Sequence, residues 1–194
     1  MRTSIIVILI LVSANCFGQN FMKRIGERLQ FGVKGGANYS NYTNADFSTS
    51  AITGFHAGAV VTFRFTDKFF AQEEFLFSTQ GAKVKSDLGD TNIKTNYLTV
   101  PFLLKYRTNL GIYIEAGTQT GILLSEDHGN LPVTHFAKKL DMGLAAGIGF
   151  QSQSGFGVGA RYVAGLSGVG DFETSGVNTN FHNSLVQASV FYLF

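Results

Sequence analysis

The sequence predicts an all-β fold: an eight-stranded antiparallel up-and-down transmembrane β-barrel with a filled polar lumen. Apolar residues alternate with small or polar ones along most of the chain, and the connections between these segments are alternately long and short. Charged residues make up only 14% of the 194 residues, whereas about 25% is usual in a soluble domain. Much of the surface is therefore expected to avoid water, and the 19 Phe and 7 Tyr argue against disorder.

Eight segments carry the period-two alternation of a β-strand. In one of them, Leu98, Val100 and Phe102 alternate with Thr99 and Pro101. Proline has no N–H for the ladder, so we expect a local bulge or a missing ladder bond at Pro101. Most segments approach the roughly 10 residues that a tilted membrane strand requires. The expected strands are residues 31–40, 55–65, 69–80, 97–106, 112–122, 141–150, 156–162 and 185–194.

The connections between these strands alternate strictly in length. Residues 66–68, 107–111 and 151–155 are short, whereas residues 41–54, 81–96, 123–140 and 163–184 are long. Alternate connections lie at the same end of an up-and-down barrel, so the short turns share one end. Outer-membrane barrels have short periplasmic turns and longer outer loops. The sequence therefore predicts an exported protein of a Gram-negative outer membrane, with both termini in the periplasm because the strand number is even.

The N-terminus predicts how the chain is exported. Residues 1–19 form a predicted secretory signal peptide, with Arg2 before an apolar run and cleavage expected after Gly18. The apolar run is too short for a spanning helix, which needs about 20 residues. In a competing lipoprotein interpretation Cys16 is lipidated, but Asn15 stands where lipidation needs a small residue. Residues 20–30 are then a periplasmic lead-in, and residues 31–194 form the barrel domain.

The less apolar faces of the strands predict the interior of the barrel. They are crowded with glycine and carry only isolated charges of both signs. Eight strands leave an interior that side chains just fill, and glycine makes room for the long ones. Since an unpaired buried ion is costly, we expect these charges to pair in the lumen. The predicted lumen network consists of Lys34, Arg64, Glu74, Lys105, Glu115, Asp141 and Arg161.

A soluble lipocalin-like carrier is the alternative fold with the same number of strands. It would place the apolar faces inside and cover its exterior with polar side chains, the reverse of a membrane barrel. The two interpretations therefore differ in where the predicted lumen charges point. A structure with these charges on the outside would contradict the membrane interpretation.

Aromatic residues toward the strand ends suit the girdles at the two membrane interfaces. The predicted girdle residues are Tyr39, Phe55, Phe65, Tyr106, Tyr162 and Tyr192. The last strand ends on Phe194, and a terminal aromatic of this kind resembles the signal that the outer-membrane barrel-assembly machinery reads. The predicted partners are therefore outer-membrane lipid and this machinery.

Several segments carry a resemblance to a known family. They are Gln72–Lys83, Asn96–Tyr106, Glu115–Gly117, Asp141–Gly143 and the final Tyr192–Phe194. The chain resembles the porin-family, PorT-like outer-membrane β-barrel proteins of Bacteroidetes, and the run from Tyr97 to Tyr106 is the most specific match. The resemblance implies the fold and the location. Some relatives are linked to protein secretion across the outer membrane, but no residue of this chain carries that role over.

No catalytic, cofactor or metal site is predicted. Ser125, Glu126, Asp127 and His128 contain the residue types of a triad or a loop metal site, but neighbouring residues do not converge as a triad must. The spacing of the four His residues matches no metal pattern; His56 is expected near a loop-facing strand end, and His128, His135 and His182 in long loops. The net charge of +2 and the absence of a dense basic cluster give no support for nucleic-acid binding.

The leading functional hypothesis is a non-enzymatic barrel with a surface-binding or structural role in the envelope. Long loops on a rigid scaffold usually carry function, and these are rich in polar and aromatic residues. The residues singled out are Asn41, Tyr42, Asn44, Asp46 and Phe47 in the first loop, and Phe172, Asn178, Asn180 and Phe181 in the last. Two alternatives stay open: an accessory component of protein secretion or envelope assembly, and a narrow channel.

Overall fold

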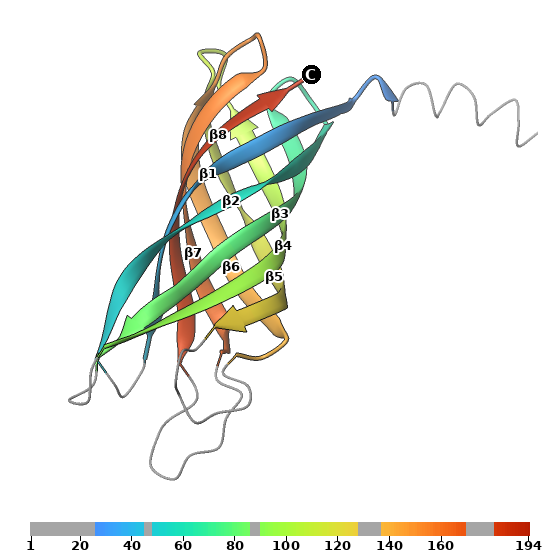
Figure 1. Cartoon of the computed structure of the whole chain (residues 1–194). Helices are drawn as coiled ribbons and strands as arrows, with labels where there is room; N and C mark the ends of the chain where they lie inside the picture. Colours follow the sequence, from blue (N-terminus) through green and yellow to red (C-terminus); the bar gives the residue numbers. More distant parts are fainter. Residues whose placement is uncertain (1–25, 45–47, 86–89, 128–136, 170–180) are drawn as a thin grey trace, which may run out of the picture.

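The computed structural model is a closed barrel in which each strand pairs antiparallel with its sequence neighbours, and β1 pairs with β8 (Figure 1). It describes residues 26–44, 48–85, 90–127, 137–169 and 181–194. The expected signal peptide lies outside this part. No helix among the described residues has both the length and the apolar character needed to cross a membrane. The strands are β1 (Leu29–Thr43), β2 (Thr49–Arg64), β3 (Phe69–Val84), β4 (Thr91–Arg107), β5 (Ile112–Asp127), β6 (Leu140–Gln151), β7 (Phe156–Gly168) and β8 (His182–Leu193).

The eight strands are those that the alternation predicts, but each of them is longer than predicted. β1 begins at Leu29, inside the expected lead-in, and β2 begins at Thr49 rather than at residue 55. β4 begins at Thr91 and β5 continues to Asp127, so the long connections are shorter than predicted. These extensions carry polar residues on both faces and contain register shifts, such as that between Ala51 and His56. Pairing continues there although the apolar alternation has stopped.

The short turns all lie at one end of the barrel, as predicted. They join β2 to β3, β4 to β5 and β6 to β7. Both ends of the barrel domain lie there too, because Gly32 near the start of β1 pairs with Leu193 at the end of β8. The strand ends that flank the long connections lie at the opposite end, which is the lower end in Figure 1. We call the two ends the short-turn end and the long-loop end.

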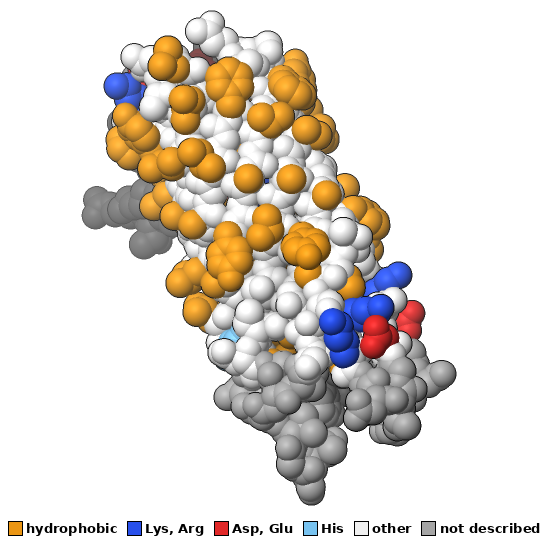
Figure 2. Space-filling model, turned by 90° about the vertical axis from the view of Figure 1, so that its left-hand side faces the viewer, with side chains coloured by type: hydrophobic (Ala, Val, Ile, Leu, Met, Phe, Trp, Pro, Cys, Tyr) orange, Lys and Arg blue, Asp and Glu red, His pale blue; other side chains and the backbone are white. Residues whose placement is uncertain are grey.

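The wall of the barrel is apolar outside and mostly polar inside. Hydrophobic side chains spread over the outer wall, while most charged side chains in the same view lie near the long-loop end (Figure 2). Phe65 and Tyr192 are exposed near the short-turn end, whereas Tyr39 and Tyr162 are exposed closer to the long-loop end. This arrangement is that of a membrane barrel rather than of a soluble carrier.

Glycines inside the wall leave space for aromatic rings in the lumen. Gly149 and Gly159 pair across β6 and β7, and the Tyr113 ring lies over both, where Cβ atoms would otherwise stand. Gly157 makes the same room for the ring of Phe191. The glycine-rich inner faces of β6 and β7 therefore provide the space that the bulky side chains of β5 and β8 occupy.

Pro101 interrupts the ladder between β3 and β4, as expected. The residue pairs of these strands pass from Glu73–Phe102 to Leu76–Thr99 without the two pairs between them. Pairing of Pro101 with Gln119 on β5 is kept. The missing N–H is thus confined to one side of the strand.

Candidate functional site

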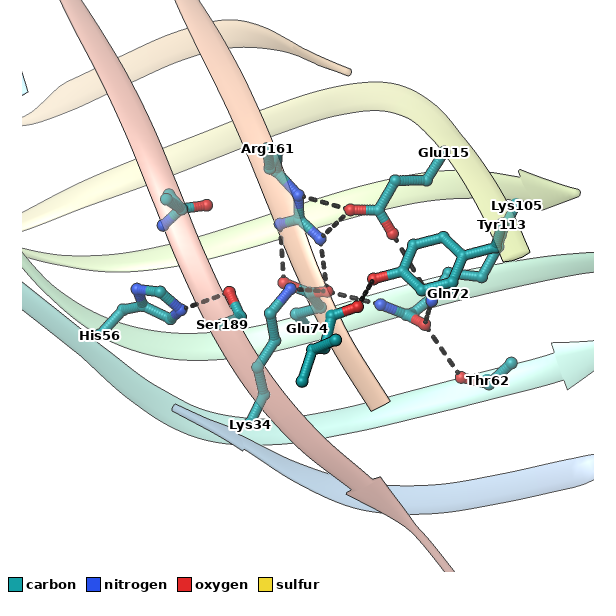
Figure 3. Close-up of polar contacts among 12 residues, drawn as sticks. Lys34, His56, Thr62, Gln72, Glu74, Lys105, Tyr113, Glu115, Arg161 and Ser189 are labelled. Atoms are coloured by element: carbon teal, nitrogen blue, oxygen red, sulfur yellow. Dashed lines mark hydrogen bonds and ion pairs between the residues drawn. The ribbon is translucent and has the colours of Figure 1, made fainter. Parts of the chain in front are cut away.

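A cluster of buried charges crosses the lumen around Arg161 of β7 (Figure 3). The guanidinium donates to both carboxylate oxygens of Glu74 on β3, at 2.9 and 2.7 Å. Its Nε donates to Glu115 on β5 at 2.8 Å. The bidentate contact with Glu74 and the second contact with Glu115 tie three strands together.

Two lysines complete this charge cluster. Lys34 Nζ lies 2.9 Å from Glu74 Oε1, and Lys105 Nζ lies 3.5 Å from Glu115 Oε2. Lys105 also donates to Gln72 Oε1 at 2.7 Å and lies 4.1 Å from the centre of the Tyr113 ring. The cluster has more cations than carboxylates. The Gln72 carbonyl and the face of the Tyr113 ring accommodate the additional positive charge.

The other two predicted members of the lumen network lie elsewhere. Arg64 is exposed at the end of β2, where its backbone N–H donates to the carbonyl of Arg28, so its prediction as a lumen residue is wrong. Arg64 continues the inward alternation of Val60 and Thr62, but it is the last residue of β2, so its side chain reaches solvent at the rim of the barrel. Asp141 does face the lumen, but close to the long-loop end. It accepts from Ser167 Oγ at 2.9 Å and has no contact with the charge cluster.

A chain of neutral polar groups lies beside the charge cluster. His56 Nδ1 lies 2.7 Å from Asn38 Oδ1, and His56 Nε2 lies 2.9 Å from Ser189 Oγ. An amide oxygen only accepts, so Nδ1 carries the proton and Nε2 accepts from the serine. His56 is 1% exposed, in the middle of the barrel wall rather than near a loop-facing strand end as expected.

This Ser189–His56–Asn38 order resembles that of a nucleophile, a base and an orienting group. Several features favour a structural role instead. Asn38 Oδ1 also accepts from Gln187, and its amide nitrogen donates to Ser78 and to backbone carbonyls. A neutral asparagine gives an imidazolium no counter-charge, and His56 is enclosed. The network joins strands and offers no open place for a reacting group.

The long-loop end of the lumen is closed by an apolar plug. Tyr42 packs against Phe181 with ring centroids 4.9 Å apart. Both residues were expected in loops that carry the function, but they are buried together in the mouth of the barrel. The plug consists of Tyr42, Ala82, Ile93, Ala137, Val169 and Phe181.

The short-turn end of the lumen is closed in a similar way. Val60, Tyr113, Phe191 and Leu193 form a second buried apolar cluster. Tyr113 and Phe191 meet edge to face, with ring centroids 6.1 Å apart. The charge cluster therefore lies between two apolar layers, which close the lumen toward both ends.

The residues from Ser125 to His128 do not form a site in the described part of the chain. Ser125 Oγ accepts from Asn96, and Glu126 Oε2 accepts from the backbone N–H of Ala137 at 2.8 Å. Both side chains are thus used to hold neighbouring segments, and His128 lies outside the described residues. His135 also lies outside them, and His182 begins β8. No group of three or more His, Cys, Asp or Glu side chains in the described residues could hold a metal ion.

Comparison with known proteins agrees with this geometry. Residues 17–170 match the family described as "Outer membrane protein beta-barrel domain". The chain belongs to this family. An outer-membrane location follows, in agreement with the sequence-based prediction. No curated protein matches the sequence of this chain.

Solved structures resemble the barrel in fold. The outer membrane protein OprG from Pseudomonas aeruginosa is 18% identical, with a TM-score of 0.55, and the match covers 85% of this chain and 95% of that chain. Ail, the attachment invasion locus protein of Yersinia pestis, is 13% identical, with a TM-score of 0.52, and the match covers 85% of this chain and 98% of that chain. At these levels of sequence identity, both matches show a shared fold and nothing more.

Proposed function

We propose that this outer-membrane barrel is a non-enzymatic scaffold that presents its long loops as a binding surface outside the cell. In this proposal the short-turn end and both termini face the periplasm. The observation that carries it is the filled lumen, in which two apolar layers enclose a buried charge cluster. A lumen filled in this way leaves the loops as the part that meets other molecules.

The bases of two long loops are held together, as a binding surface requires. Lys138 N–H donates to the carbonyl of Val169, and Val169 N–H donates to the carbonyl of Phe181, both at 2.8 Å. The segment that follows residues 128–136 and the two segments that flank residues 170–180 are therefore fixed relative to one another. Another barrel of this fold, Ail, has been solved in complex with the heparin analogue sucrose octasulfate, which supports ligand binding by such a scaffold.

Replacement of single loops tests this function. Residues 45–47, 86–89, 128–136 and 170–180 are each replaced by a short Gly-Ser linker, with the plug residues left unchanged. We expect folded barrels in each case, and we expect at least one variant to fail to restore the binding or envelope function that a null strain lacks. If all four variants restore the null strain as well as the unchanged protein does, the loops are not the working part.

A second candidate is an accessory role in secretion or envelope assembly through a periplasmic partner. One observation favours it: the rim at the short-turn end carries four cations, against the two acidic residues Glu27 and Asp67. The cations are Arg28, Arg64, Lys68 and Arg107, and none of them forms an ion pair with the described residues. This rim fits an acidic partner. The resemblance to PorT-like proteins of Bacteroidetes points the same way.

Photo-crosslinking separates this candidate from the first. A crosslinker at Lys68 should capture a periplasmic protein if the rim is the working surface, and a crosslinker at Gln153, on a turn without charged side chains, is the matched control. Capture at neither position would remove the support for this role. The filled lumen argues against the third alternative, a narrow channel.

A further inference from the structure

A small cavity lies inside the barrel toward the long-loop end, away from the charge cluster. Gly121, Gly143 and Gly165 line it and leave it unfilled. The space is about that of one water molecule or one small ion. Asp141 near the start of β6 and Asn183 near the start of β8 also line it, so it lies below the apolar plug.

Oxygen atoms without partners line this cavity. Asn183 Nδ2 donates to Gln80 Oε1 and lies 3.5 Å from Asp141 Oδ2, which fixes the orientation of the amide. Asn183 Oδ1 is then left buried without a hydrogen-bond donor, and Gln119 Oε1 is in the same condition. Both side chains are only 6% exposed. Buried acceptors of this kind nearly always have a donor or a cation as partner.

The cavity also holds a carboxylate, Asp141, which has hydrogen-bond donors but no ion pair with the described residues. Asp141 Oδ1 accepts from Ser167, but the carboxylate forms no ion pair with the described residues. Lys34, Lys105 and Arg161 are engaged with Glu74 and Glu115. A carboxylate in a narrow interior without a cation is costly.

We propose that this cavity binds one small monovalent cation, Na⁺ or K⁺, through the Asp141 carboxylate and the amide oxygens of Gln119 and Asn183. A water molecule could donate its two hydrogens to the two amide oxygens, but it would not offset the charge of the Asp141 carboxylate. A divalent ion such as Ca²⁺ takes six to eight oxygen ligands, usually from several carboxylates. One carboxylate with neutral amide oxygens fits a single positive charge. The bound ion joins β5, β6 and β8 beneath the plug.

Unfolding in different salts tests the site. The full-length protein, folded in detergent micelles, is unfolded with urea and followed by far-UV circular dichroism. Choline chloride is replaced stepwise by NaCl or KCl at constant ionic strength. We expect the ratio of folded to unfolded protein to rise with the small cation, approaching tenfold for each tenfold increase in concentration above its dissociation constant. Asp141→Asn should abolish this dependence.

Asp90→Asn is the matched control, because Asp90 forms an exposed ion pair with Lys83 and should leave the dependence unchanged. Equal midpoints in choline, Na⁺ and K⁺ would overturn the proposal and assign the cavity to water. So would an unchanged response in Asp141→Asn. If that variant does not fold, the salt series on the unchanged protein decides, together with crystals grown in RbCl. A strong anomalous peak between Asp141 and Asn183 is expected, and a water-sized peak would contradict the site.

Discussion

Arg161 is the residue on which the buried charges of the lumen depend. It contacts both carboxylates of the charge cluster, while Lys34 and Lys105 each reach only one of them. Such a cluster adds little net stability compared with apolar packing. Removal of one partner, however, leaves a buried charge without a counter-charge in a low-dielectric interior. The cluster therefore fixes how the strands meet around the lumen.

Replacement of Arg161 by Met should destabilise the barrel strongly. The two carboxylates lose their shared partner, and we expect a loss of about 3–5 kcal/mol in the free energy of unfolding, measured by urea unfolding in micelles. Lys83→Met is the control, since the exposed ion pair of Lys83 with Asp90 is worth about 0–1 kcal/mol. Equal effects of the two substitutions would show that the Arg161 contacts are not important for stability.

Gly159 and Tyr113 should be coupled. A Cβ at position 159 would collide with the hydroxyl of Tyr113, while its next neighbour, Tyr113 Cζ, is at 3.3 Å. We expect Gly159→Ala to cost about 1–3 kcal/mol through overpacking. Tyr113→Phe removes the colliding oxygen, so the double variant should be more stable than the sum of the single effects predicts. Strict additivity in this cycle of unfolding measurements would contradict the packing described here.

The alternation of the sequence indicates which residues face the lumen, but not how deep they lie. Glu74, Lys105 and Glu115 are all on polar faces of alternating segments, and the structure brings them together. Asp141 shares the same pattern, yet strand register and stagger place it near the long-loop end. Register depends on pairing between distant segments, which a single sequence does not display. The role of Gln72 as a partner of Lys105 was likewise not predictable.

At the scale of elements, the strands are recognisable from the apolar alternation only where lipid faces them. Beyond the aromatic residues near the long-loop end, the outer face no longer has to be apolar. Thr91–Asn96 of β4 is therefore a strand that the hydrophobic pattern does not show. The strand count and the order of short and long connections were predictable, because they depend on the membrane-facing segments.

Two of the three short turns are built around glycine. Gly111 and Gly155 each close a turn with φ of +91° and donate a backbone hydrogen bond to Thr108 and Ser152, respectively. A Cβ on Gly155 would also collide with the carbonyl of Leu193. Two equivalent turns thus need a residue that accepts a left-handed backbone.

Gly155→Ala should therefore cost about 1–3 kcal/mol and lower the yield of folded barrel after dilution from urea into micelles. Gly35→Ala is the matched control: its added Cβ would meet only the carbonyl of His56 at 3.6 Å. We expect that control to stay within about 0.5 kcal/mol of the unchanged protein. A similar loss for both would mean that the turn conformation is not the cause.

At the scale of the whole molecule, the barrel combines a lipid-facing exterior with a lumen filled in layers. The exterior was predictable, because composition and alternation together exclude a polar outer surface. The apolar plug was not, because Tyr42 and Phe181 are far apart in the sequence and lie in polar surroundings. Their burial turns two expected loop residues into part of the closure.

Conductance across a planar lipid bilayer tests the central claim, that the lumen is closed, most directly. The purified barrel is inserted in a planar bilayer in about 1 M KCl. It should show no stable open conductance level. Phe181→Gly and Arg161→Gly, which open the plug and the charge cluster, serve as the comparison that a path can be created. A steady open conductance of the unchanged protein would contradict the closed lumen and favour a channel.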